Sequence, residues 1–158
     1  MIKAVLAAMA GTVAFSALFG VPSCYYAYCG LTGGAGWAIY QLCAGYLGEA
    51  ESCLIAAMAV VLLSRFMAIW KRCPVTIFLI SGIFPLVPGA GIYWTSYYLV
   101  TNQLPLAVST GYQAVKDAVA IVLGIVFVFE LPQQLFLKIL GRNDKMLHPG
   151  WKPRKKNG

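Results

Sequence analysis

One stretch of the sequence combines a long apolar run with four helix-disrupting residues within the seven positions 85–91: Pro74-Val-Thr-Ile-Phe-Leu-Ile-Ser-Gly-Ile-Phe-Pro-Leu-Val-Pro-Gly-Ala-Gly-Ile-Tyr93. Pro85 and Pro88 have no backbone N–H, and each ring opposes the carbonyl group four residues earlier. Gly89 and Gly91 permit backbone angles that are closed to other residues. The stretch therefore predicts an apolar helix that breaks near its middle. A simple kink that helps neighbouring helices to pack is the alternative.

The composition around this stretch indicates a membrane protein. Of the 158 residues, 60% are apolar and 11% are charged, whereas soluble domains are closer to one half and one quarter. The net charge of +7 does not indicate nucleic-acid binding, because seven of the twelve basic residues lie in the last 21 positions and leave the rest almost uncharged. The composition thus excludes an ordinary cytosolic enzyme and a disordered chain.

Five segments are long and apolar enough to cross a bilayer as helices. We expect an all-α bundle of five transmembrane helices in residues 1–132, followed by an amphipathic and polybasic cytoplasmic tail in residues 133–158. No internal repeat is present, and many transporters consist of two repeats with the site between them. The five segments therefore resemble one half of such a protein: Ala4–Val21, Tyr28–Tyr46, Ser52–Trp70, Val75–Val100 and Leu106–Leu131.

The distribution of basic residues predicts the orientation. Arg65, Lys71 and Arg72 flank the third connection, the tail is basic, and the second connection carries Glu49 and Glu51. The positive-inside rule then places the N-terminus outside and the C-terminus inside a cytoplasmic (inner) membrane. The basic tail is suited to anionic lipid headgroups. The first segment could alternatively be a cleaved signal peptide, but its sequence offers only a weak cleavage site.

Small residues indicate close helix packing. Gly30 and Gly34 form a GxxxG pattern, and Gly11 follows Ala7 at the same spacing in the first segment. The five cysteines lack metal-ligand spacing, so we expect no metal or other cofactor. Cys43 and Cys53 fall near the outer ends of adjacent helices, where a disulfide is compatible with the topology, although cysteine as a small apolar residue is the favoured interpretation.

Three charged residues are candidates for intramembrane function. Lys116 and Asp117 lie deep in the bilayer if the last helix starts at Leu106, and at its outer interface if the helix starts near Ala118. Arg65 is within reach of the headgroups, with anion binding as the alternative. The single histidine, His148, is in the tail, and no nucleophile, base and acid occur together. We therefore expect a protein that is not an enzyme.

The motifs resemble the threonine/serine exporter family. The resemblance covers about residues 3–132 and matches the C-terminal five-helix domain of that family, which also occurs as a separate small membrane protein. Its most specific part is the P-x-x-P-G-x-G-x-Y pattern. Three stretches carry it: Phe19-Gly-Val-Pro22, Tyr28-Cys-Gly-Leu-Thr-Gly-Gly-Ala-Gly-Trp37, and Phe78 to Tyr93.

The resemblance implies the small subunit of a two-component exporter, with a larger membrane protein of the same family as its partner. The implied substrates are threonine and serine or dicarboxylates such as succinate, with export coupled to the proton gradient. A structural subunit that transports nothing, and a self-sufficient homo-oligomeric channel, are the alternatives. By position, the unwound segment beside the transport path consists of Pro85, Pro88, Gly89, Gly91 and Tyr93.

Overall fold

The computed structural model describes residues 2–131, and this part of the chain consists of helices without a strand. The predicted all-α class is confirmed. The basic tail and its predicted attachment to anionic lipids lie outside the described residues. In chain order the helices are α1 (Ile2–Leu18), the 3-10 helix η1 (Ser23–Tyr25), α2 (Tyr26–Cys43), α3 (Glu49–Lys71), α4 (Val75–Ile83), the 3-10 helix η2 (Phe84–Leu86), α5 (Gly89–Val100) and α6 (Leu104–Phe129).

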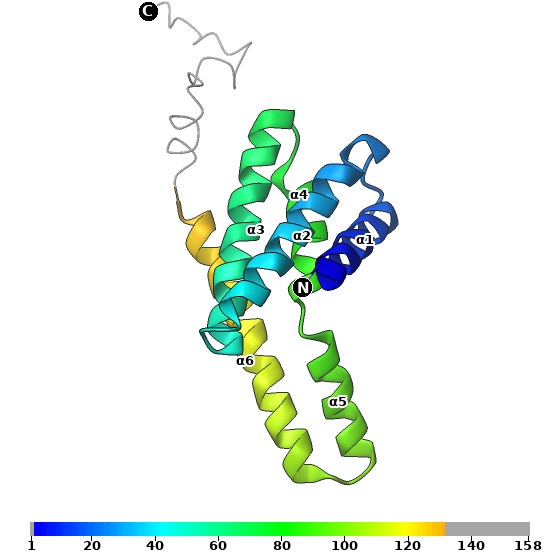
Figure 1. The fold of residues 1–158 in the computed structure, drawn as a ribbon, viewed down its shortest axis with the longest axis vertical. Coiled ribbons are helices and arrows are strands. Elements are labelled where there is room, and N and C mark those ends of the chain that lie inside the picture. The colour runs from blue at the N-terminus through cyan, green and yellow to red at the C-terminus, as the bar shows by residue number, and fades with distance from the viewer. Residues whose placement is uncertain (1, 132–158) are drawn as a thin grey trace, which may run out of the picture.

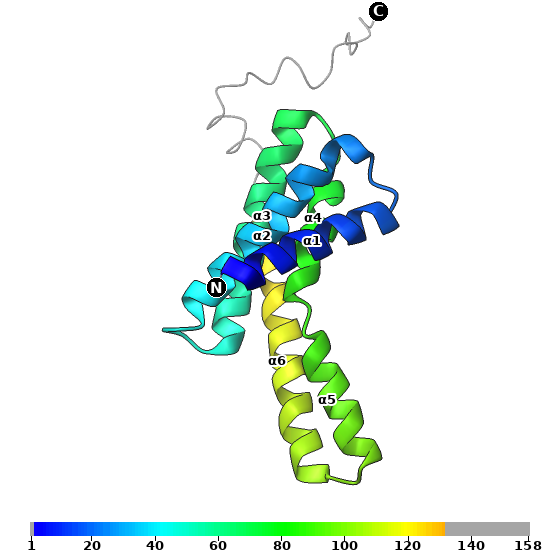
Figure 2. The same cartoon turned by 45° about the vertical axis from the view of Figure 1, so that its right-hand side comes forward.

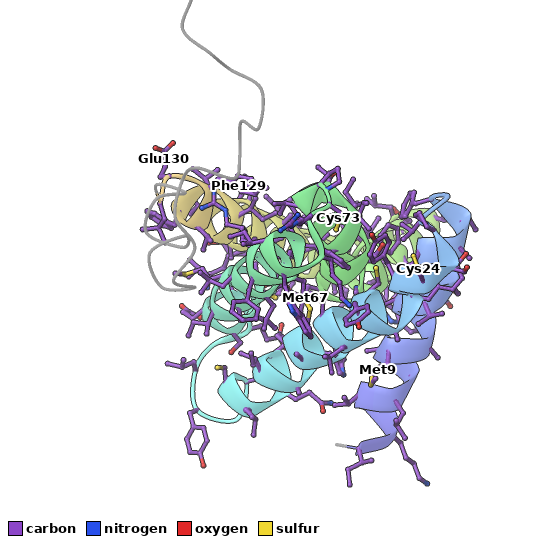
Figure 3. The ribbon with its side chains drawn as sticks, turned by 90° about the horizontal axis from the view of Figure 1, so that it is seen from above. Met9, Cys24, Met67, Cys73, Phe129 and Glu130 are labelled. Carbon is purple, nitrogen blue, oxygen red and sulfur yellow. The ribbon has the colours of Figure 1, made fainter. Side chains whose placement is uncertain are left out.

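The helices form a bundle with a projecting hairpin. Helices α1 to α4 pack together, whereas α5 pairs with the first half of α6 and extends away from them (Figures 1 and 2). Seen from above, Met9 on α1 and Phe129 at the end of α6 lie on opposite sides of the bundle, with Met67 between them (Figure 3). Because α4 belongs to the bundle and α5 to the hairpin, the break between these two helices lies where the hairpin leaves the bundle.

Helices α3 and α6 run side by side in the same direction. A Cβ atom at Gly124 of α6 would lie 2.7 Å from the Leu54 carbonyl oxygen of α3. One and a half turns later along α6, the Phe129 carbonyl accepts a hydrogen bond from Arg65 of α3. The contacts move toward the C-terminal ends of both helices, so α3 and α6 are parallel. The first half of α6 therefore extends beyond the start of α3, where it pairs with α5 to form the hairpin.

The glycines of α2 allow α1 to approach closely. A Cβ atom at Gly30 would lie 2.9 Å from Val13 Cγ2, and one at Gly34 would overlap the side chain of Met9. Gly11, by contrast, has no atom of residues 2–131 within 4 Å of an added Cβ atom, apart from its own helix and chain neighbours. The structure thus places the GxxxG pattern of α2 against α1 and leaves Gly11 on an open face.

Buried hydroxyl groups in the bundle are satisfied within their own helices. Ser64 donates to the Val60 carbonyl at 2.7 Å, Ser16 to the Thr12 carbonyl at 2.8 Å, and Ser81 to the Ile77 carbonyl at 3.2 Å. Such bonds let polar side chains lie in an apolar interior without a second partner. These residues are therefore structural, and the candidate site lies elsewhere.

Two helices, α3 and α6, are long and apolar enough to cross a membrane. Helices α4 and α5, which enclose a bend of 46°, form a third candidate when they are counted as one broken span. Helix α1 is apolar but has only 17 residues. The described residues thus contain two or three candidate spans by length and composition, and the five-crossing arrangement stays a prediction.

Candidate functional site

The chain is broken between α4 and α5, as the proline and glycine pattern predicts. Helix α4 ends at Ile83, η2 forms a single turn, and α5 begins at Gly89. Pro88 cannot donate to the Phe84 carbonyl, so that carbonyl instead accepts from the Val87 amide at 3.2 Å. The Gly89 amide donates to the Val87 carbonyl at 2.7 Å. These tight turns replace helical bonding and redirect the chain by 46°.

Aromatic contacts attach the break to α1. The Phe84 ring of η2 stacks on the Phe15 ring with 3.7 Å between centroids, and the Phe19 ring lies 5.8 Å away. Stacked aromatic side chains restrict each other's orientation as well as burying area. The position of η2 is therefore fixed by packing on α1 as well as by its own turns.

A cavity of about 440 Å³ lies beside the break. Its wall comes from α2, from the start of α3, from the break with the first turns of α5, and from the middle of α6. Gly89, Trp94 and Glu49 are exposed members of this wall, so the cavity opens at the surface. Its lining residues are Trp37, Tyr40, Glu49, Cys53, Pro85, Leu86, Val87, Pro88, Gly89, Ala90, Gly91, Trp94, Thr110, Gln113, Ala114 and Asp117.

The N-terminus of α5 forms one side of this cavity. Amide groups in the first turn of a helix have no acceptor within the helix, and Ala90 and Gly91 occupy that turn. Gly91 packs directly on α6, because an added Cβ atom would lie 3.0 Å from Ala114 Cβ. The partial positive charge of this helix end therefore faces the cavity about one turn from Asp117 on α6.

Asp117 is the buried carboxylate of the cavity. It lies near the middle of α6 and is 9% exposed. Gln113, one turn earlier, donates from Nε2 to Asp117 Oδ1 at 2.9 Å. Among residues 2–131, no lysine or arginine side chain forms an ion pair with Asp117, and the adjacent Lys116 is exposed. Asp117 thus has one neutral hydrogen-bond donor and faces the cavity.

The remaining polar groups make the cavity acidic. Among the described residues 2–131, its lining includes two carboxylates, Asp117 and Glu49, and no lysine, arginine or histidine. Trp37, whose ring lies 5.2 Å from that of Tyr40, has a buried indole N–H without an acceptor in the described structure. A buried donor without a partner is uncommon and indicates an unfilled polar interaction. The cavity therefore offers negative charge on one side and free N–H donors on the others.

The residues predicted from the sequence divide into two groups. Pro85, Pro88, Gly89 and Gly91 line the cavity together with Asp117. Tyr93 is 62% exposed and does not line the cavity, whereas its neighbour Trp94 does. Lys116 is exposed and does not line the cavity, and Arg65 lies in the second half of α3, away from the cavity. The break and the buried carboxylate of Asp117 thus belong to one site.

Sequence reasoning missed several lining residues. Gln113 precedes Asp117 by four positions, and this spacing is a recognisable signal for a side-chain pair on one helix face. The sequence places Glu49 only in an acidic connection, and its position at the cavity depends on where α3 begins. No pattern in the sequence identifies Trp37, because its role depends on contact between separate helices.

Arg65 joins α3 to the end of α6. It is 6% exposed, and its Nη1 and Nη2 atoms donate to the carbonyls of Leu131 at 2.8 Å and Phe129 at 3.0 Å. Its guanidinium group also lies 4.9 Å from the centroid of the Phe129 ring. Carbonyl groups at a helix C-terminus lack helical donors and carry partial negative charge. The geometry favours a structural role over the predicted alternative of anion binding.

We expect Arg65→Met to lower the stability of the protein in detergent. The change leaves the α6 carbonyls without their donors, which costs roughly 1–3 kcal/mol for buried groups. Thermal unfolding followed by intrinsic fluorescence measures the effect. Arg65→Lys keeps the positive charge but cannot donate to both carbonyls with the geometry of a guanidinium group. Its stability should therefore fall between that of Arg65→Met and that of the wild type. Equal stability of all three proteins would contradict this role.

The cysteines supply no second site in the described structure. All five have free thiol groups, and Cys53 is buried in the cavity wall, whereas Cys43 is partly exposed at the end of α2. Residues 2–131 bring together no group of three or more His, Cys, Asp or Glu side chains that could hold a metal ion.

The fold and the site define a class: an apolar helical protein with helices long enough to span a membrane and a polar cavity at a broken helix. Comparison with known proteins gives the family. Residues 4–130 match the family described as threonine/serine exporter, ThrE, so this chain belongs to the threonine/serine exporter family. Membership supports a membrane location and a role in transport.

A characterised relative is the threonine/serine exporter of Corynebacterium glutamicum. The chain is 33% identical to it over 97 residues, which are 61% of this chain and 20% of the relative. The matched region thus spans about one fifth of the relative's length. No solved structure matches the chain.

Proposed function

We propose that this chain is the small subunit of a two-component efflux transporter that exports small zwitterionic amino acids of the threonine/serine type. Its five apolar segments cross the cytoplasmic membrane with the N-terminus outside, and a proton gradient drives export. The cavity at the break forms one wall of the substrate path. The observation that carries this proposal is that the N-terminus of α5 and the buried Asp117 face the same cavity.

The two sides of the cavity suit the two ends of an amino acid. Helix N-termini bind carboxylates through free amides and partial positive charge, and the first turn of α5 supplies both. A carboxylate such as Asp117 binds a substrate ammonium group through charge-assisted hydrogen bonds. Contact of Gly91 with Ala114 places these two features about one helical turn apart, which is compatible with the small size of the substrate.

The same charges disfavour a dicarboxylate. The second carboxylate of succinate would lie near Asp117 and Glu49, and the part of the chain that the structure describes adds no cationic side chain to the lining to balance it. Like charges at short range in a partly desolvated site repel strongly. Amino acids are therefore the favoured substrates.

The open cavity supports a larger partner. Its wall is exposed at Gly89 and Trp94, so a second protein can cover it there. The projecting hairpin of α5 and α6 carries no charged residue between Gly89 and Val115, so its exposed surface is suited to lipid or to apolar helices. A second membrane subunit of the same family would complete the wall of the path.

Purification of the tagged chain from its own membranes in mild detergent tests the assembly. We expect a larger membrane protein of the same family to co-purify in a fixed ratio. Vesicles that contain both proteins should then transport threonine or serine and not succinate. A homo-oligomer that transports by itself would contradict the two-component proposal and support the channel. Transport by the partner alone at the full rate would indicate a structural subunit.

A further inference from the structure

We infer that a proton and the substrate ammonium group compete for the carboxylate of Asp117, and that this competition couples export to proton entry. The inference rests on the proposed function of the cavity. It adds the residue that exchanges one cation for the other, and so gives the chain's own contribution to coupling.

The negative charge of Asp117 is not balanced by a basic side chain of residues 2–131. Its carboxylate is buried, accepts one hydrogen bond from the neutral Gln113, and has no basic partner in residues 2–131. An ionised carboxylate away from water is costly unless a cation or a proton accompanies it. The cavity therefore favours uptake of either a proton or a cationic group at this position.

The groups around Asp117 strengthen this preference. Helix α3 contributes Glu49 and Cys53, with Glu51 farther away, and α2 contributes Tyr40. Helix α5 contributes no charged side chain, and the nearby cation is the exposed Lys116 on α6 itself. The acidic neighbours favour positive charge at Asp117, and the cavity gives a substrate access to it.

The carboxylate of Asp117 has room for one cation at a time. Gln113 already holds Oδ1, so the remaining face of a single carboxylate can accept an ammonium group or carry a proton but not both. Substrate and proton binding at one group are therefore negatively linked, and the linkage is reciprocal. Arrival of a proton from the outside displaces the ammonium group, and arrival of a substrate from the inside releases the proton to the cytoplasm. One proton then enters for each amino acid exported.

The test compares Asp117→Asn with Lys116→Gln, a matched control at the adjacent exposed position, in vesicles that contain the complete complex. Two activities are measured: exchange of labelled for unlabelled threonine without a gradient, and net transport driven by a pH gradient. For the wild type and Lys116→Gln we expect both activities. For Asp117→Asn we expect loss of gradient-driven transport, with residual exchange at high substrate concentration.

Proton release gives a readout that a merely structural role would not change. In weakly buffered solution, threonine binding to the wild-type complex should release up to about one proton per substrate, and the apparent Kd should rise toward about tenfold per unit of falling pH. Asp117→Asn should release none and bind independently of pH. Asp117→Glu, which retains an ionisable group, should restore part of both effects.

The outcomes separate this inference from the proposed function. Gradient-driven transport or proton release at the wild-type level in Asp117→Asn overturns the competition at Asp117 and leaves the substrate cavity standing. Loss of exchange, binding and proton release in Asp117→Asn and Asp117→Glu alike overturns it too, because the residue then serves the structure. A wild-type complex that neither binds nor exchanges threonine overturns the proposed function itself.

Discussion

The double variant Pro85→Ala/Pro88→Ala should assemble and remain folded but lose export. Alanine at position 88 restores an N–H that can donate to the Phe84 carbonyl, so α4 and α5 can join into a straighter helix. The free amides at the start of α5 would then be used within the helix and no longer face the cavity. We expect the export rate to fall about tenfold or more, the effect of about 1.4 kcal/mol of lost site stabilisation.

A matched control is Pro105→Ala. Pro105 lies in the first turn of α6, where proline is compatible with a helix and lines no part of the cavity. It should export at the wild-type rate. Export by the double variant at the wild-type rate, with normal amounts of assembled protein, would show that the break is only a packing kink.

Gly124→Ala should cause the largest loss of stability among the glycine variants of the bundle. The added Cβ atom would meet backbone atoms of α3, with the Leu54 carbonyl oxygen at 2.7 Å and the Met58 amide nitrogen at 3.3 Å. Backbone cannot move aside as a flexible side chain can, so α3 and α6 must separate. Overpacking of this kind costs about 1–3 kcal/mol, measured as a lower unfolding midpoint in detergent.

Gly11→Ala is the control, because this substitution should not lower the stability of the protein. The structure leaves open space around a Cβ atom at Gly11, and alanine in a helix is favoured over glycine by about 0.5–1 kcal/mol. We expect unchanged or slightly raised stability. A strong destabilisation by Gly11→Ala would instead mean that a helix absent from this chain packs on that face.

The break could be predicted from the sequence because its cause is local. Pro85 and Pro88 lack the N–H groups that a continuous helix needs wherever the segment lies, and the structure ends α4 at Ile83 and begins α5 at Gly89. The apolar segments are recognisable as helices for a similar reason, since length and hydropathy depend on the segment itself. The number of segments that cross the membrane depends on neighbouring helices and is not determined by composition.

The parts that were not predicted depend on contacts between distant residues. Gly11 and Gly30 belong to equal small-residue patterns, but only contact with another helix determines which face is buried. Arg65 binds carbonyls more than sixty residues away, which no local pattern indicates. Asp117 could be placed only once α6 was found to begin at Leu104, although the turn at Asn102 and Pro105 in the first helical turn are signals for that start.

The most direct test of the cavity as the substrate path is substrate protection of a cysteine placed at its mouth. Ala90 is small, exposed and part of the cavity lining, so Ala90→Cys should react with a water-soluble thiol reagent. Peptide mass spectrometry reads modification at residue 90 separately from the native cysteines. Ala10→Cys, on an exposed position of α1 outside the cavity, is the control.

We expect threonine or serine to slow modification of Ala90→Cys in the assembled complex and to leave Ala10→Cys unaffected. Succinate at the same concentration should protect neither position, because the acidic cavity disfavours a second carboxylate. Full modification of Ala90→Cys at the same rate with and without threonine, in a complex that transports threonine, would contradict the account and place the path elsewhere.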